Sequence, residues 1–143
     1  MHHVSRFLVL VVLLTSVPAH ARTQAAVHKN LMRAVQVAVD VYRAQGMAEL
    51  IGTTQHCYAQ SNTQGFYCVY LDFASRRIAQ LVRAAAAREG LPIPKKAFFH
   101  NASLSERLAP VFRQANMDRE QSHAYVRVLT SIMHQLVDEK RRL

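Results

Sequence analysis

Cys57 and Cys68 are the residues whose chemistry the sequence constrains most tightly, because they are the only two cysteines and allow a single pairing. Ten residues separate them, whereas redox-active thiol–disulfide enzymes usually carry a C-x-x-C turn at a helix start. We therefore predict a structural disulfide between them. Closing a loop of this length typically stabilises a fold by about 3 kcal/mol, through the entropy of the unfolded chain.

Histidine is the other residue type here that could support metal binding or acid–base catalysis. Five histidines follow residue 21: His28, His56, His100, His123 and His134. No two of them have the i, i+4 spacing of a helical zinc site. His123 and His134 would lie on one face of a helix but about 16 Å apart, too far to share an ion. We therefore predict no metal site and no cofactor.

Signatures of enzymes are also missing. No serine stands in a nucleophile elbow, no glycine-rich phosphate loop is present, and the disulfide would leave neither cysteine as a free thiolate. The carboxylates are predicted at helix caps or on polar helix faces. Asp72, for example, is placed on the polar side of a helix, four residues before Arg76. We therefore predict a non-enzymatic protein.

One candidate partner-binding segment lies within residues 91–102, where Pro92 and Pro94 exclude regular helix. Its charged and aromatic side chains are Lys95, Lys96, Phe98, Phe99 and His100. Loops carry function more often than cores do, so these side chains could contact a partner. In the alternative interpretation, both phenylalanines fold inward to fill the core and the lysines are only solvated. The sequence leaves the two interpretations open.

A second candidate surface is a row of arginines on a predicted helix. Arg76 and Arg83 are two turns apart on one side of it, with Arg77 and Arg88 nearby. Guanidinium groups bind carboxylates bidentately, so an acidic partner could be held there. A merely solvated helix face is the alternative.

Apolar residues at helical spacing predict the elements that must position these groups. They indicate helices over residues 27–45, 47–59 and 68–89, with Gly46 as the left-handed residue that ends the first. Residues 66–70 also have strand propensity, but no second such run offers a pairing partner, so helix is favoured.

Two further helices are predicted from capping signatures. Ser103 with Glu106 and Asp118 with Gln121 both have the spacing of a capping box. Pro110 indicates either a kink in the first of these helices or a helix that begins near it. The sequence therefore predicts an all-α fold, a small bundle of about five helices, in which the disulfide joins helices 2 and 3.

Residues 1–21 have the pattern of a cleavable secretory signal peptide. The apolar run at residues 7–14 follows a positively charged start and is too short to cross a bilayer core of about 30 Å. Ala19 and Ala21 are the small residues that signal peptidase requires. We predict cleavage near Ala21 and a single periplasmic or secreted domain, residues 22–143. Such a compartment favours disulfide formation.

The chain is strongly basic, with a formal net charge of +9. The predicted leader contains only one of the basic residues and none of the acidic ones, so the charge remains +8 after cleavage. An anionic partner is expected. Outside the cytoplasm the candidates are lipid head groups, cell-wall polymers or an acidic protein face, and no nucleic acid is expected.

The leader, the helical pattern and the Cys57/Cys68 pair, with Cys68-Val69-Tyr70-Leu71-Asp72 opening a helix, resemble the periplasmic immunity proteins that neutralise cell-wall amidase effectors of type VI secretion. Members of that family often act as dimers and insert a loop into the effector's active site. The resemblance implies a protein partner, a secreted toxin or effector, and leaves a homodimer open. The sequence thus predicts an exported binding protein, with a basic accessory protein that binds anionic envelope lipid or cell-wall polymer as the alternative.

Overall fold

The computed structural model describes residues 19–60 and 65–142, with side chains described from residue 23 onward. Residues 1–18, which belong to the predicted leader, and residues 61–64, between two of the predicted helices, lie outside this part of the chain. The described elements are the α-helices α1 (Ala19–Ala59), α2 (Gly65–Arg88), α3 (Asn101–Gln114) and α4 (Arg119–Arg142), with a short 3-10 helix η2 (Ala97–Phe99) before α3. The all-α prediction is confirmed for these residues. No helix among them is long and apolar enough to cross a membrane.

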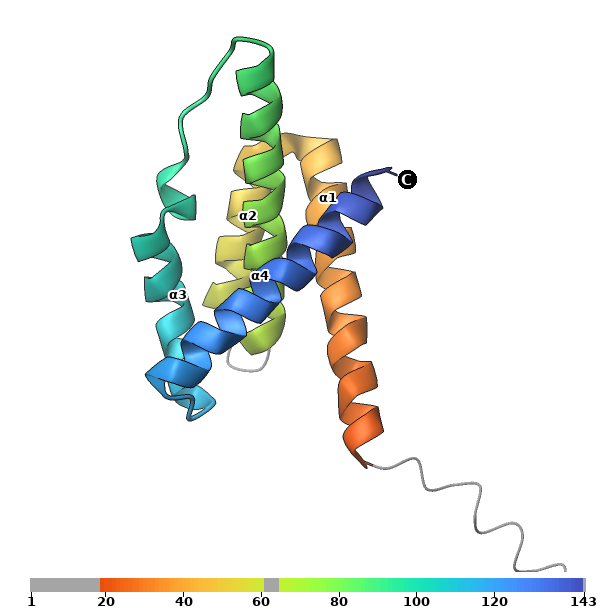
Figure 1. The fold of residues 1–143 in the computed structure, drawn as a ribbon, viewed down its shortest axis with the longest axis vertical. Coiled ribbons are helices and arrows are strands. Elements are labelled where there is room, and N and C mark those ends of the chain that lie inside the picture. Colours follow the sequence, from red (N-terminus) through yellow and green to blue (C-terminus); the bar gives the residue numbers. More distant parts are fainter. Residues whose placement is uncertain (1–18, 61–64, 143) are drawn as a thin grey trace, which may run out of the picture.

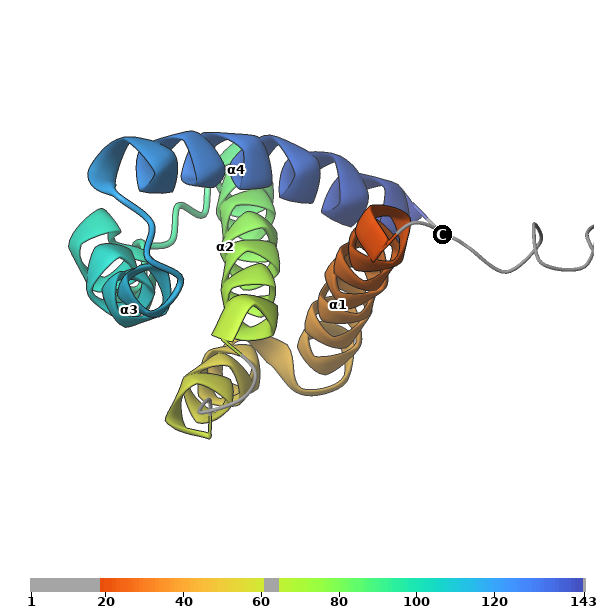
Figure 2. The same ribbon diagram turned by 90° about the horizontal axis from the view of Figure 1, so that it is seen from below.

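The helices are arranged around α2. Figure 1 shows the N-terminal part of α1 on one side of α2 and α3 on the other, with the C-terminal part of α1 behind α2, while α4 crosses α2 diagonally and reaches α1. The view from below shows the same order, with α4 running along one side of the molecule past α3, α2 and α1 (Figure 2). Each of α1, α3 and α4 therefore covers a different part of the surface of α2.

Gly46 bends α1 rather than ending it. Its φ of 82° and ψ of −172° are not helical, yet helix continues on both sides of this one residue. The two predicted helices 27–45 and 47–59 are therefore the two arms of α1. The predicted count of five is wrong, because the described residues form four α-helices. The positive φ expected at Gly46 is confirmed, and it lets the chain change direction without an intervening loop.

The predicted disulfide is confirmed. Cys57 and Cys68 are bonded, with their Cα atoms 5.6 Å apart. The bridge joins the end of the second arm of α1 to the first turns of α2. Residues 66–70 are helical, as favoured above.

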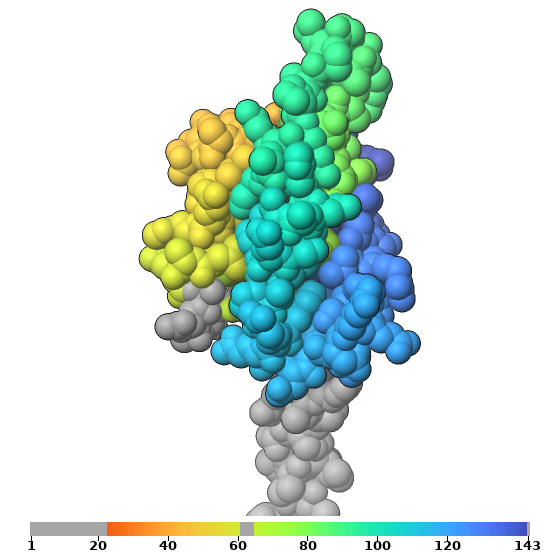
Figure 3. Space-filling view, turned by 90° about the vertical axis from the view of Figure 1, so that its left-hand side faces the viewer, coloured from red at the N-terminus to blue at the C-terminus, as the bar shows by residue number. Residues whose placement is uncertain are grey.

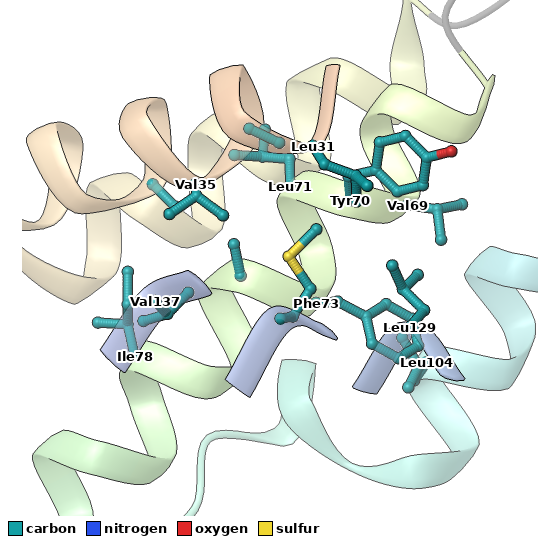
Figure 4. Packing of buried hydrophobic residues seen from close by; sticks show 14 of the residues in the cluster. Leu31, Val35, Val69, Tyr70, Leu71, Phe73, Ile78, Leu104, Leu129 and Val137 are labelled. Carbon is teal, nitrogen blue, oxygen red and sulfur yellow. The ribbon is translucent and has the colours of Figure 1, made fainter. Parts of the chain in front are cut away.

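The core is centred on α2, where residues 68–75 are buried without a break. A helix that is buried all round must have neighbours on every side. Figure 4 shows Ile78 of α2 beside Val137 of α4, and Phe73 of α2 beside Leu129 of α4. Residues 68–75 therefore have no solvent-exposed face, in contrast to the amphipathic pattern expected for this helix.

The two predicted capping boxes have opposite outcomes. The backbone N–H of Asp118 donates to Oε1 of Gln121 over 2.9 Å, and that of Gln121 donates to Oδ1 of Asp118 over 2.8 Å, so this box is confirmed. The capping box predicted at Ser103 is wrong. Helix α3 begins at Asn101, and His100 occupies the N-cap position without a side-chain hydrogen bond. Pro110 lies inside α3, which does not begin there.

Candidate functional site

The two segments proposed to bind a partner meet in the structure. Arg83 Nε donates to the backbone oxygen of Ile93 over 3.3 Å, and Arg76 Nη2 donates to Oδ1 of Asn101. Lys95 lies between these contacts in the chain and within electrostatic range of both guanidinium groups. We call Arg76, Arg83 and Lys95 the basic surface. Figure 3 looks onto the side of the molecule formed by α3 and the segment that precedes it.

The turn after α2 explains why the segments meet. Gly90 adopts φ 73°, the backbone N–H of Leu91 bonds to the oxygen of Ala86 over 2.9 Å, and that of Gly90 bonds to Ala87 over 3.2 Å. This is the pattern of a Schellman cap, which reverses the chain at a helix end. The following segment has no regular structure as far as η2, and it returns along α2 so that residue 93 reaches Arg83 (Figure 1).

The electrostatics of the basic surface favour an anion. Partial burial, and then repulsion by Arg76 and Arg83, lower the pKa of Lys95. The ion pairs among the described residues join Arg77 to Asp138 and Arg107 to Asp72. Asp72 also attracts Arg76 electrostatically, but neither ion pair includes Arg76, Arg83 or Lys95. In addition, the buried Nη1 atom of Arg76 has no hydrogen-bond partner in the described part of the chain. An incoming carboxylate would relieve the mutual repulsion of these cations.

The two phenylalanines of the predicted segment have different surroundings. Phe99 is only 2% exposed and packs in the core, as the inward interpretation expects. Phe98 is half-buried, makes an edge-to-face contact with Phe99 at 5.1 Å between ring centroids, and has the guanidinium carbon of Arg107 3.7 Å from its own centroid. Lys96 and His100 are exposed. The accessible part of the segment is therefore cationic rather than aromatic.

Asp72 is a site residue whose surroundings the sequence reasoning missed. Its predicted position on a polar face is wrong, because α3 covers it and its exposure is 0%. It accepts hydrogen bonds from Nε and Nη2 of Arg107, over 2.7 and 3.0 Å, and from the hydroxyl of Tyr58 over 3.1 Å. Burial raises the pKa of Asp72, while the bonds from Arg107 and Tyr58 oppose that shift. One signal was available: Asp72 is the single charged residue between Gly65 and Ser75.

A cluster of three residues, Tyr58, Asp72 and Arg107, positions the basic surface, and we call it the Asp72 cluster. Tyr58 comes from the second arm of α1, Asp72 from α2 and Arg107 from α3, so their contacts join three elements. Arg107 also donates through Nη1 to the backbone oxygen of Ser103 over 3.0 Å and stacks on Phe98. It therefore holds both α3 and η2 against the body, and with them the segment that carries Lys95.

Metal ligands do not converge in the described residues, where no three His, Cys, Asp or Glu side chains form a group that could hold an ion. His134 lies within electrostatic range of Arg77 and Asp138. Burial, and then repulsion by Arg77, lower the pKa of His134.

No family model, curated protein or solved structure matches this chain. Its function must therefore be inferred from the chemistry of the basic surface.

Proposed function

We propose that this protein is an exported, non-enzymatic binding protein that holds an acidic face of another protein against its basic surface. The observation that carries the proposal is the meeting of Arg83 with the segment around Lys95. Two segments that the sequence singles out separately for their charge form one surface, and no ion pair of the described residues includes its three cations. Clustered cations of this kind attract acidic partners over long range and bind carboxylates at contact.

The disulfide indicates an oxidising, non-cytoplasmic location. The predicted leader, residues 1–21, is consistent with that location and makes the periplasm or the exterior of the cell the proposed destination. The resemblance to immunity proteins supports a secreted toxin or effector as the partner. In that role the protein would act by occupying the partner's surface, without chemistry of its own.

A matched pair of double variants tests the proposal. The full chain, produced so that the disulfide forms, is immobilised and used to capture envelope proteins at physiological salt. Arg83→Gln/Lys95→Gln removes two charges from the basic surface. Arg113→Gln/Arg127→Gln removes the same charge from exposed positions on α3 and α4.

We expect the native chain and the Arg113/Arg127 variant to retain the same protein, and the Arg83/Lys95 variant to lose at least about tenfold in affinity for it. The identified partner is then tested in purified form by calorimetry. Retention of the partner by the Arg83/Lys95 variant, or the absence of any saturable protein partner, would contradict the proposal.

The net charge of +9 favours a second candidate, a basic accessory protein that binds anionic envelope lipid or wall polymer. Its test is sedimentation with phosphatidylglycerol vesicles over a range of salt concentrations. Screening over about 8 Å at physiological salt would abolish such binding. Both double variants would weaken vesicle binding equally, because diffuse attraction depends on total charge. This equality distinguishes the accessory protein from the first candidate, for which only the Arg83/Lys95 variant loses its partner.

A further inference from the structure

A second site lies on the opposite face of α2 from the basic surface. A cavity of about 390 Å³ opens between α1, α2 and α4. Its apolar lining comes from Val39, Tyr42, Ile78, Leu81, Val82, Ala85, Ala86 and Val137. At 3.6 residues per turn, Ile78, Leu81 and Ala85 lie about half a turn around α2 from Arg76 and Arg83. The cavity is therefore independent of the surface assigned to the protein partner.

The local sequence explains the space. Ala85 and Ala86 line the cavity with single methyl groups, where larger side chains would fill it. Tyr42 and Arg43 come from the last turn of the first arm of α1, just before Gly46 turns the chain away. On the remaining side, the end of α4 reaches α1 after crossing α2 (Figures 1 and 2). The three helices thus diverge around small side chains.

Charged groups are confined to the rim. Arg43, Glu89 and Arg141 are exposed there, and the ion pairs of the described residues include none of them. Two guanidinium groups against one carboxylate leave a net positive rim above an apolar interior. A ligand that matches both parts has one apolar chain and one anionic end.

We propose that this cavity binds a free single-chain fatty acid, with its chain in the apolar interior and its carboxylate at Arg43 and Arg141. The volume of about 390 Å³ falls within the range of small-molecule sites. At about 30 Å³ for each group the size of a water molecule, it accommodates roughly a dozen chain carbons. A phospholipid with two long chains exceeds this volume.

The test measures laurate binding to the full chain by titration calorimetry below the micelle concentration. Ala85→Leu and Ala86→Leu each fill the cavity, while Ala84→Leu adds the same side chain at an exposed position one residue away. Arg43→Gln/Arg141→Gln removes the rim charges, and Arg113→Gln/Arg127→Gln is its charge-matched control. Thermal unfolding confirms that each variant is folded.

We expect one laurate per chain, and affinity for decanoate lower by about fifteenfold, since each buried methylene contributes roughly fourfold. Ala85→Leu and Ala86→Leu should each lower laurate affinity at least tenfold and Ala84→Leu should not. The Arg43/Arg141 variant should lose about two- to fivefold per guanidinium.

No laurate binding by the native chain, or unchanged binding in both cavity-filled variants, overturns the proposal. A rim variant that binds as tightly as its control overturns the role of the carboxylate. If a second copy of the chain covers the cavity instead, sedimentation will show a dimer that laurate does not dissociate, and this result also overturns the proposal.

Discussion

Replacing Asp72 by Asn, and separately Asp138 by Asn, compares a buried and a partly exposed ion pair, each of which joins α2 to a neighbouring helix. Both carboxylates accept two hydrogen bonds from one guanidinium: Asp72 from Arg107 over 2.7 and 3.0 Å, Asp138 from Arg77 over 2.9 and 2.6 Å. The geometry is matched, but the burial differs. The side chain of Asp72 is 0% exposed and that of Asp138 is 32% exposed.

The expected losses follow from this difference. Asp72→Asn leaves Arg107 largely buried without a counter-charge, which costs about 3 kcal/mol of unfolding free energy. Arg77 is covered nearly as well as Arg107, at 20% against 16% exposed, so the difference comes from the carboxylates. Asp138 lies partly in water, where breaking its pair costs at most about 1 kcal/mol. With a urea slope of about 1.5 kcal/mol per molar, the midpoint falls by roughly 2 M in the first variant and by well under 1 M in the second.

Urea unfolding at neutral pH, followed by far-ultraviolet circular dichroism, measures both midpoints. Hydrogen exchange adds a local readout, because Arg107 holds α3 in place. We expect faster exchange in α3 after Asp72→Asn than after Asp138→Asn. Equal losses in the two variants would refute the reasoning, since they would show that burial of the carboxylate does not set the cost of breaking the pair.

The disulfide, the buried aromatic ring and one histidine give further measurable outcomes. Cys57→Ser/Cys68→Ser should lower the unfolding free energy by about 3 kcal/mol in urea titrations, and an unchanged midpoint would contradict the entropic account. Phe99→Ala should cost about 3–5 kcal/mol in calorimetric unfolding, whereas a loss below 1 kcal/mol would place the ring outside the core. The lowered pKa of His134 means that the unfolded chain binds a proton more readily, so stability should fall as pH drops through 6.5. His134→Gln should flatten that part of the urea-midpoint profile, and an unchanged slope would assign the effect to another group.

The features predicted correctly from sequence are those set by neighbours along the chain. Gly46 is left-handed because other residues resist that conformation, wherever the rest of the molecule lies. Asp118 and Gln121 satisfy each other's backbone donors within one turn. The pairing of Cys57 with Cys68 needed only the absence of a third cysteine. The glycine conformation and the capping box depend on residues within one helical turn, and the disulfide depends on there being only one possible cysteine pair.

The same local reasoning failed where distant segments decide. Ser103 and Glu106 have the spacing of a capping box, but α3 starts earlier, directly after η2. Asp72 has the spacing of an exposed helix residue, but α3 brings Arg107 over it. A carboxylate buried in this way is stable only beside a matched cation, and nothing in the order of residues links position 72 to position 107.

The amino-acid sequence alone determines that this protein is helical and basic and that it can form one disulfide. Helical periodicity, charge and cysteine number are properties of the chain itself. Tertiary packing decided that Phe99 is core, that Lys95 lies beside Arg83, and that a cavity remains at Ala85. These outcomes depend on how helices far apart in sequence cross one another. That crossing is set by the sum of many side-chain contacts rather than by any short pattern.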